Sequence, residues 1–230
     1  VVSQRAPVRL GREVFLTGAL ASSAISSAVE TMRLFRKVMD DEKVDHYRAV
    51  ATSAVREAEN GHLLVERAHR EAGIDIEVIE GVEEARLVQL AVSRKLRFGE
   101  RRAVLIDIGG GSTELTLIEQ EEPRCSQSLP VGTVRLLEAF LEADVAVDAR
   151  HGELVREFVE RVFVELTPDI ADAQPDVLVA TGGNCETLAS LCPKAGGEAP
   201  TIDVKSMQRL VRDLAAMSSR ERMEIGRAHV

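Results

Sequence analysis

The stretch Asp107-Ile-Gly-Gly-Gly-Ser-Thr-Glu114 decides the fold, because it joins two apolar segments through a turn rich in glycine. Residues 103–106 form a continuous apolar run, which is typical of a strand covered on both faces. Residues 114–118 alternate more nearly between polar and apolar side chains, as a second strand would. We predict that the two segments form a hairpin, with Asp107 and Glu114 at the same open end of the sheet.

The bulk composition is that of an ordinary folded protein, since 45% of the 230 residues are hydrophobic and 29% are charged. The formal net charge of −9 argues against nucleic acid or an anionic membrane as a partner, because a basic surface usually holds both. An anionic ligand must therefore be bound locally, by backbone amides, a metal ion or a few arginines.

Nothing in the sequence indicates export or a membrane anchor. No apolar run reaches the roughly 18 residues needed to span a bilayer, and no signal peptide opens the chain. Cys125, Cys185 and Cys192 lack the C-x-x-C spacing, and the five histidines complete no metal-ligand motif. We expect free thiols and a cytoplasmic protein.

Strands and helices interleave along the chain, which indicates an α/β fold in two parts. A long amphipathic helix begins at Gly81 and is followed by a short polar break at residues 98–102. We place the domain boundary in this break. Residues 1–99 then form the first domain and residues 100–230 the second.

The two ends of the chain carry separate expectations. Residues 8–10 and 14–17 are largely apolar and flank Gly11-Arg12, a pattern that predicts a β-hairpin. The chain opens without a methionine, so we expect earlier elements of the fold to be missing. Residues 225–230 follow a strongly helical segment without capping residues, and we expect this tail not to be native.

Five residues between the two predicted strands suit a phosphate: Gly109, Gly110, Gly111, Ser112 and Thr113. The glycines have no side chains to keep a ligand away and can turn their amides inward, while the other two add hydroxyl donors. The alternative is a glycine-rich turn that only reverses the chain. Neither the Walker A pattern nor the dinucleotide G-x-G-x-x-G pattern is present, so a conventional P-loop or Rossmann site is excluded.

The carboxylates that flank this loop favour the binding role over the simple turn. If the strands pair, Asp107 and Glu114 lie close enough to hold one Mg²⁺ through water, because this ion prefers oxygen ligands and keeps much of its hydration. Other divalent cations would suit the same ligands. The sequence therefore predicts a combined phosphate and metal site.

Two residues outside the loop, Glu84 and Arg56, also have chemistry that suits a phosphate site. Glu83 and Glu84 fall in the first turn of a helix, where acidic residues often only stabilise the helix dipole. A carboxylate there could orient water, because phosphoryl transfer asks little more of its base. Arg56 could grip a phosphate with its planar guanidinium, or form a surface ion pair with Glu57 or Glu59.

A second glycine turn, Thr181-Gly-Gly-Asn184, lies at a strand-to-helix junction, where the amides of Gly182 and Gly183 could meet an anion. Tight packing between the strand and the helix explains these glycines equally well. A basic cluster near the domain boundary could guide a polyanion, although charged helix faces are usually only solvated. It comprises Arg94, Lys95, Arg97, Arg101 and Arg102.

Four segments in one order resemble the exopolyphosphatase and guanosine pentaphosphate phosphohydrolase family, which is similar to the actin, sugar kinase and Hsp70 superfamily. The segments are Ala51-Thr-Ser-Ala-Val-Arg-Glu-Ala-Glu-Asn60, Ile79-Glu-Gly-Val-Glu-Glu-Ala-Arg-Leu87, Leu105-Ile-Asp-Ile-Gly-Gly-Gly-Ser-Thr-Glu-Leu115 and Ser128-Leu-Pro-Val-Gly-Thr-Val-Arg-Leu136. The resemblance implies two actin-like, ribonuclease H-like α/β domains around a cleft, the first truncated at its N-terminus. The family's first phosphate loop, an aspartate followed by Gly-Ser-Asn-Ser, is absent from this sequence.

The resemblance also implies roles for the candidate residues. Glu84 would be the base that positions water, while Asp107 and Glu114 would serve the Mg²⁺. The loop at residues 109–112 would cradle a phosphate, and Arg56 would be a second phosphate ligand. The implied function is release of terminal phosphate from inorganic polyphosphate, with guanosine pentaphosphate as a second substrate to be tested.

Two other functions stay open. One is an ATP-dependent kinase of the same superfamily, with adenosine held at Gly182 and Gly183. The other is a non-catalytic sensor that binds an alarmone nucleotide. The family's second glycine turn commonly continues with threonine where this chain has Asn184, which bears on specificity at that side of the site. Assembly into a homodimer is also left open.

Overall fold

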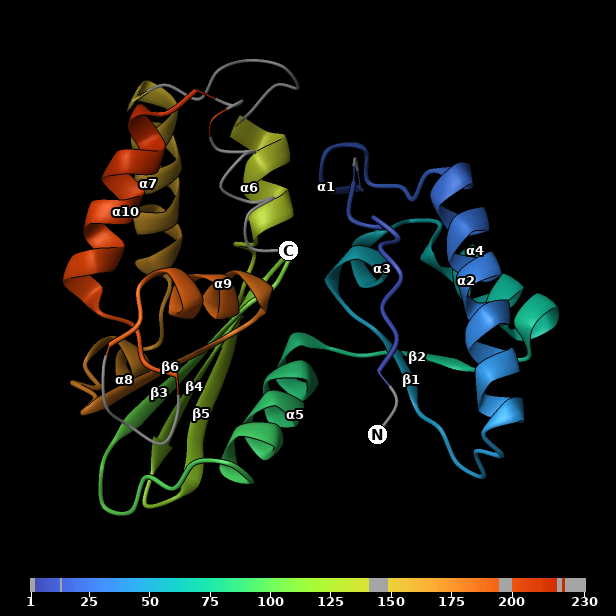
Figure 1. The fold of residues 1–230 in the computed structure, drawn as a ribbon, viewed down its shortest axis with the longest axis horizontal. Coiled ribbons are helices and arrows are strands. Elements are labelled where there is room, and N and C mark those ends of the chain that lie inside the picture. The colour runs from blue at the N-terminus through green and yellow to red at the C-terminus, as the bar shows by residue number, and fades with distance from the viewer. Residues whose placement is uncertain (1–2, 13, 141–148, 195–199, 219–220, 222–230) are drawn as a thin grey trace.

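The computed structural model describes residues 3–12, 14–140, 149–194, 200–218 and 221, which form two lobes joined through one helix (Figure 1). The first lobe is built on a two-stranded parallel sheet of β1 (Ala49–Ala51) and β2 (Ile76–Val78). Its helical elements are α1 (Val14–Thr17), α2 (Ser22–Asp41), α3 (Ser53–Glu57), α4 (Gly61–Arg67) and the π-helical turn η1 (Ala68–Ala72).

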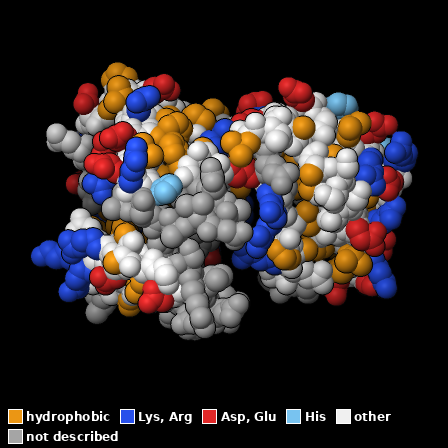
Figure 2. Space-filling view, turned by 90° about the horizontal axis from the view of Figure 1, so that it is seen from above, with side chains coloured by type: hydrophobic (Ala, Val, Ile, Leu, Met, Phe, Trp, Pro, Cys, Tyr) orange, Lys and Arg blue, Asp and Glu red, His pale blue; other side chains and the backbone are white. Residues whose placement is uncertain are grey.

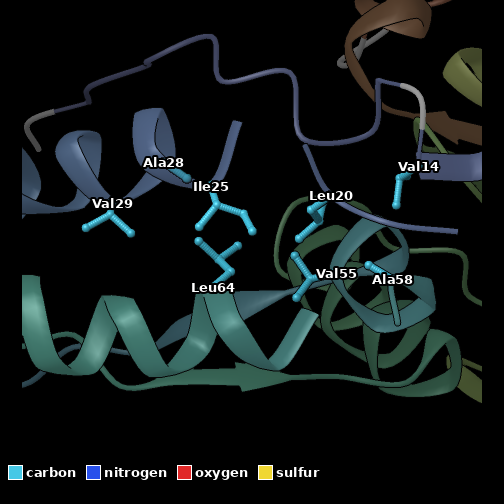
Figure 3. Close-up of a cluster of buried hydrophobic side chains, with 8 residues drawn as sticks. All are labelled: Val14, Leu20, Ile25, Ala28, Val29, Val55, Ala58 and Leu64. Carbon is cyan, nitrogen blue, oxygen red and sulfur yellow. The ribbon is translucent and has the colours of Figure 1, made fainter. Parts of the chain in front are cut away.

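The core of the first lobe follows from the apolar spacing of its longest helix, α2. Ile25, Ala28 and Val29 recur at intervals of three and four residues and are buried on one side of α2. They belong to one buried cluster with Leu64 of α4 and Val55 of α3, and Figure 3 shows Ile25 pointing toward Leu64. This packing fixes α3, which carries Arg56 of the candidate site.

The predicted hairpin at residues 8–10 and 14–17 is wrong. Residues 8–10 lie in irregular structure, and residues 14–17 form α1. The Gly18 amide donates to the Val14 carbonyl oxygen at 2.9 Å, which closes a helical turn. A run of four apolar residues fits a buried helical turn as well as a strand, so the sequence pattern could not separate the two.

The second lobe is built on a four-stranded mixed sheet in the order β5-β4-β3-β6. The strands are β3 (Ala103–Ile108), β4 (Thr113–Glu119), β5 (Glu122–Leu129) and β6 (Val177–Thr181). The pairs β3–β4 and β4–β5 are antiparallel, and β6 runs parallel to β3. The other elements of this lobe are α6 (Thr133–Phe140), α7 (Ala149–Phe163), α8 (Pro168–Ala171), α9 (Gly183–Leu191) and α10 (Val204–Ala216).

The sheet of the second lobe is covered on both faces, as the apolar run at residues 103–106 predicted. On one face, Leu105 and Ile118 pack with Val92 of α5 (Gly81–Ser93). On the other face, Val104 and its neighbours pack against α7 and α8. The α/β fold in two parts is therefore confirmed.

Helix α5 precedes the predicted domain boundary in sequence but packs on the second sheet. It begins directly after β2 of the first lobe and ends before β3 of the second (Figure 1). The division into residues 1–99 and 100–230 stays a prediction. The arrangement nevertheless brings the first turn of α5 close to the end of β3, beside the first lobe.

The surface seen from above mixes acidic and basic side chains over both lobes (Figure 2). Among the described helices, none is long and apolar enough to cross a membrane. The tail at residues 225–230 lies outside the described residues, so its expectation stays a prediction.

Candidate active site

A row of four polar side chains crosses the second sheet, one from each strand: Thr181, Asp107, Glu114 and Ser128. Directly paired residues share a face of a sheet, so all four lie on one side. Asp107 is two residues beyond Leu105, which packs against α5, and alternation therefore turns the row toward α5. The hairpin prediction is confirmed, since Asp107 and Glu114 are direct partners in the β3–β4 register.

The two carboxylates in the row are each held by a hydroxyl from the outer strand beside them. Thr181 Oγ1 donates to Asp107 Oδ1 at 2.5 Å, and Ser128 Oγ donates to Glu114 Oε1 at 2.7 Å. A Cβ atom at Gly81 would lie 2.4 Å from Ser128 Oγ, so only glycine lets the start of α5 approach this closely. The close approach brings Glu84 over the row.

Glu84, Asp107 and Glu114 form an acidic cluster in which one oxygen from each lies within 4.8 Å of the others. Glu114 is only 2% exposed. Glu84 Oε2 and Glu114 Oε2 are buried and have no hydrogen-bond partner among the described residues. Buried polar atoms are normally satisfied, so two orphaned carboxylate oxygens facing a third carboxylate fit a cation.

The protonation of the cluster reflects its burial. Burial and the nearby charges of Glu114 and Asp107 together raise the pKa of Glu84 to about 7, although Arg56 acts in the opposite direction. Burial also raises the pKa of Glu114, although hydrogen bonds from Ser112 and Ser128 oppose this. Carboxylates that are buried close to one another resist full ionisation, because burial and the neighbouring negative charge both disfavour the charged form. A cation among them would remove that resistance.

Arg56 reaches the cluster from the first lobe. Its Nη1 donates to the Ile79 carbonyl oxygen at 2.6 Å and lies 3.9 Å from Glu84 Oε2. Arg56 therefore forms its ion pair with Glu84. The alternative of a surface ion pair with Glu57 or Glu59 is wrong. A guanidinium already turned toward the carboxylates is placed to meet an anion bound beside them.

The glycine loop at residues 109–112 lies between the two carboxylate-bearing strands. The amides of Gly110, Gly111 and Ser112 donate no hydrogen bond to any residue that the structure describes. The Thr113 hydroxyl is already used, because it donates to the Val131 carbonyl oxygen at 2.6 Å. The free donors of this loop are its amides, which is the pattern of a backbone anion nest.

The second glycine turn follows β6, beside the end of β3. Gly182 has φ of +101°, and a Cβ atom there would lie 2.6 Å from the Ile108 carbonyl oxygen. Tight packing therefore accounts for Gly182. Gly183 begins α9 and has open space around its Cα, so a ligand role for this turn stays a prediction.

The basic cluster near residues 94–102 lies at the other end of the strands. Arg102 directly precedes β3 and pairs with Glu119 at 2.7 Å, and Arg101 donates to the Arg97 carbonyl oxygen. Asp107 is five residues further along an extended strand, roughly 15 Å away. The cluster does not line the acidic site.

Sequence reasoning did not single out three residues that shape the site: Thr181, Ser128 and Arg135. Ser128 and Arg135 belong to the fourth segment of the family resemblance, but nothing local says what they contact. Arg135 Nε donates to the Gly111 carbonyl oxygen at 2.7 Å. A hydroxyl at the end of a strand beside a carboxylate-bearing strand is the signal that could have found Thr181.

An acidic cluster beside a loop of free amides, on an α/β scaffold, is typical of enzymes that process phosphate groups. Comparison with known proteins gives the particular family. The chain belongs to the Ppx/GppA phosphatase family, whose model matches residues 1–229. The family predicted from the four segments is confirmed.

The relatives of this chain include proteins named exopolyphosphatase and proteins named guanosine-5′-triphosphate,3′-diphosphate pyrophosphatase. Exopolyphosphatase 1 of Mycobacterium leprae is 31% identical over 229 residues, covering 97% of this chain and 67% of that protein. The guanosine-5′-triphosphate,3′-diphosphate pyrophosphatase of Vibrio vulnificus is 30% identical over 218 residues, covering 95% and 43%. The chain thus spans about two thirds of the first relative and less than half of the second.

Solved structures agree in fold. An exopolyphosphatase from Cytophaga hutchinsonii matches with a TM-score of 0.87 at 29% identity, over 97% of this chain and 74% of that chain. A Ppx/GppA family member from Aquifex aeolicus matches with a TM-score of 0.75 at 28% identity, over 99% and 74%. Both lobes therefore have counterparts in these structures.

Proposed function

We propose that this chain carries the active site of an exopolyphosphatase, which hydrolyses the terminal phosphoanhydride bond of inorganic polyphosphate. The observation that carries the proposal is the acidic cluster of Glu84, Asp107 and Glu114 beside the free amides of residues 110–112. One part suits a cation and a water molecule, and the other suits a phosphate group. The exopolyphosphatase relatives support the choice of substrate.

Asp107 and Glu114 would hold Mg²⁺, because their oxygens meet at one end of the sheet and hydroxyls orient them. When bound, Mg²⁺ would neutralise charge on the phosphate oxygens and on the carboxylates. Other divalent cations with a preference for oxygen ligands would fit the same residues.

Glu84 would act as the general base. Among the described residues, none donates a hydrogen bond to its Oε2, and a pKa of about 7 suits a group that must accept a proton near neutral pH. In the reaction, a bond forms between the water oxygen and the terminal phosphorus, and the bond from that phosphorus to the bridging oxygen breaks. The shortened polyphosphate leaves with the bridging oxygen, and Glu84 takes the proton that the water loses.

The amides of Gly110, Gly111 and Ser112 would bind oxygens of the phosphate, and Arg56 would bind from the first lobe. Fixed dipoles and a fixed guanidinium stabilise charge in the transition state without having to reorganise. The pyrophosphatase relatives make guanosine pentaphosphate the second substrate to test, since its terminal phosphate is attached through the same type of bond.

The deciding experiment is a phosphate-release assay on the protein at its native length, with long-chain polyphosphate, guanosine pentaphosphate and ATP compared in the presence of Mg²⁺. We expect polyphosphate to release phosphate faster than ATP. Consumption of ATP together with inertness toward polyphosphate would favour the kinase. Nucleotide binding without any phosphate release would favour the sensor.

Glu84→Gln provides the test within the site, and Glu83→Gln is its matched control. The two carboxylates are neighbours in the first turn of α5, but Glu83 is turned to Arg86 and Arg48. Loss of a general base lowers turnover by about 10²- to 10⁴-fold, which we expect for Glu84→Gln alone. Equal activity in the two variants would remove Glu84 from the reaction.

A further inference from the structure

Arg135, on α6 of the second lobe, contacts three separate elements. Its Nε donates to the Gly111 carbonyl oxygen at 2.7 Å, and its Nη2 donates to both carboxylate oxygens of Glu57 at 2.7 and 2.6 Å. Its guanidinium carbon lies 4.2 Å from the centre of the Phe15 ring. Glu57 belongs to α3 and Phe15 to α1 of the first lobe, and α1 lies beside α6 in Figure 1.

The first-lobe contacts hold this side chain in place. Arg135 is 18% exposed, so solvent weakens its ion pair less than it would an open surface pair. A guanidinium can donate to a carboxylate, donate to a carbonyl and lie over an aromatic ring at once, and an ammonium group cannot. Glu57 directly follows Arg56, so α3 reaches both the acidic cluster and Arg135.

The backbone of α6 holds the two carbonyls that precede Gly111. The Thr133 amide donates to the Gly109 carbonyl oxygen at 3.0 Å. The Val134 and Arg135 amides both donate to the Gly110 carbonyl oxygen, at 2.8 and 3.0 Å. Together with the Arg135 side chain, the start of α6 therefore holds three consecutive carbonyls of the loop on one side.

This arrangement sets the direction of the loop amides. In a trans peptide unit, the carbonyl and the following N–H point in opposite directions. Carbonyls of residues 109, 110 and 111 that face α6 therefore turn the amides of Gly110, Gly111 and Ser112 away from it. These three amides are the free donors of the loop. The last of the three peptide units is held by the Arg135 side chain, and the first two by backbone.

We propose that Arg135 is a positioning residue for phosphate binding, which aims the Ser112 amide by holding the Gly111 carbonyl and is itself fixed by Glu57 and Phe15. The inference rests on the proposed function in one respect, that the loop amides bind phosphate. It adds a direct connection between the first lobe and the loop. Arg135 itself lies behind the loop and acts on phosphate only through the backbone.

The test compares Arg135→Met with Arg33→Met. Arg33 makes similar contacts inside the first lobe, to the Glu71 carboxylate at 2.9 Å and the Glu71 carbonyl oxygen at 3.1 Å. For Arg135→Met, we expect KM for polyphosphate to rise roughly tenfold, the usual weight of a charged hydrogen bond, with kcat within about threefold. The KM of Arg135→Lys should lie between those of the wild type and Arg135→Met. If Arg135→Met does not fold, Arg135→Lys takes its place in the test.

Backbone order is the second readout, and it is independent of activity. We expect the NMR order parameter of the Ser112 amide to fall from about 0.85 to below about 0.6 in ligand-free Arg135→Met, and to stay high in Arg33→Met. An unchanged order parameter in both arginine variants would overturn the proposal. Wild-type protein that releases no phosphate would instead contradict the proposed function, and the order parameters would still decide the role of Arg135.

Discussion

Asp107 and Glu114 face each other as direct partners across the β3–β4 hairpin, with Glu84 of α5 above them. Two like charges directly opposite in a sheet destabilise it unless something compensates them. Hydroxyls on both sides stabilise the carboxylates but do not neutralise them. With Glu84, the pair forms an acidic cluster that could hold a cation.

The first prediction is that Mg²⁺ stabilises the folded protein through this pair. Added Mg²⁺ should raise the thermal midpoint of the wild type, because a ligand that binds only the folded state adds stability. Asp107→Asn should lose most of this increase. Asp41→Asn, at an exposed position in α2, should keep it. An equal increase in both variants, measured by calorimetry, would exclude Asp107 as a ligand.

The second prediction concerns pH in the metal-free protein. The pKa of Glu84 is raised to about 7, above the value of 4.5 for an ordinary glutamate. Between these values, the folded state binds more protons than the unfolded state, so stability falls as pH rises from 4.5 to 7. Glu84→Gln should remove this loss, which is on the order of 1–3 kcal/mol in the free energy of unfolding. Compared with wild type, the variant should therefore gain stability between pH 4.5 and pH 8.

Urea denaturation in the presence of a chelator, repeated across pH, measures the effect. Glu83 supplies the contrast, because hydrogen bonds from Arg86 and Arg48 lower its pKa to about 2. Its contribution is present above pH 4.5 and is lost as pH falls toward 2. Glu83→Gln should therefore alter the pH dependence of stability only below about pH 4.5. A Glu84→Gln profile parallel to wild type between pH 4.5 and 7 would contradict the assigned pKa.

The third prediction concerns the hydroxyls that orient the carboxylates. Thr181→Val keeps the shape of the side chain but removes the donor to Asp107 Oδ1, and Thr181→Ser keeps the donor. Removal of such an outer partner typically costs about 10- to 100-fold in metal affinity. Titration calorimetry with Mg²⁺ should show that loss for valine and near-normal binding for serine. Normal affinity in Thr181→Val would mean that Asp107 needs no orienting partner.

The sequence predicted the hairpin, the loop and the carboxylates because these depend on residues that are near one another in the chain. The apolar run, the three glycines and the two acids lie within 12 residues, residues 103–114, and their pairing follows from strand geometry. Residue chemistry suggested Glu84 and Arg56 only as one option among others, and the family resemblance implied their roles, because their positions in the cluster depend on the packing of α5 and α3.

The remaining features depend on contacts between distant segments. Arg135 and Glu57 are 78 residues apart, and Thr181 and Asp107 are 74 apart. No local pattern predicts that such residues meet, because their distance is set by the order of strands and the packing of the lobes. The wrong assignment of α1 has a related cause, since burial of Val14 against the first-lobe core outweighs the strand propensity of a short apolar run.

The fourth prediction tests why the start of α6 can hold the glycine loop. A Cβ atom at Gly132 would lie 2.3 Å from the Gly110 carbonyl oxygen and 2.4 Å from the Gly111 amide nitrogen. Both are backbone atoms, which cannot move aside as a flexible side chain can. Gly132→Ala must therefore push α6 away from the loop and weaken the hydrogen bonds from residues 133–135.

Gly152→Ala is the matched control, because Gly152 lies within α7 and its added Cβ would meet nothing within 4 Å apart from its chain neighbours and the backbone of its own helix. The control should gain up to about 1 kcal/mol, since alanine favours the helix. Gly132→Ala should lose about 1–3 kcal/mol through overpacking and should also bind polyphosphate more weakly. Denaturation and KM together decide the point: lost stability with an unchanged KM would separate the packing of α6 from the ligand-binding amides, and unchanged stability would contradict the close approach itself.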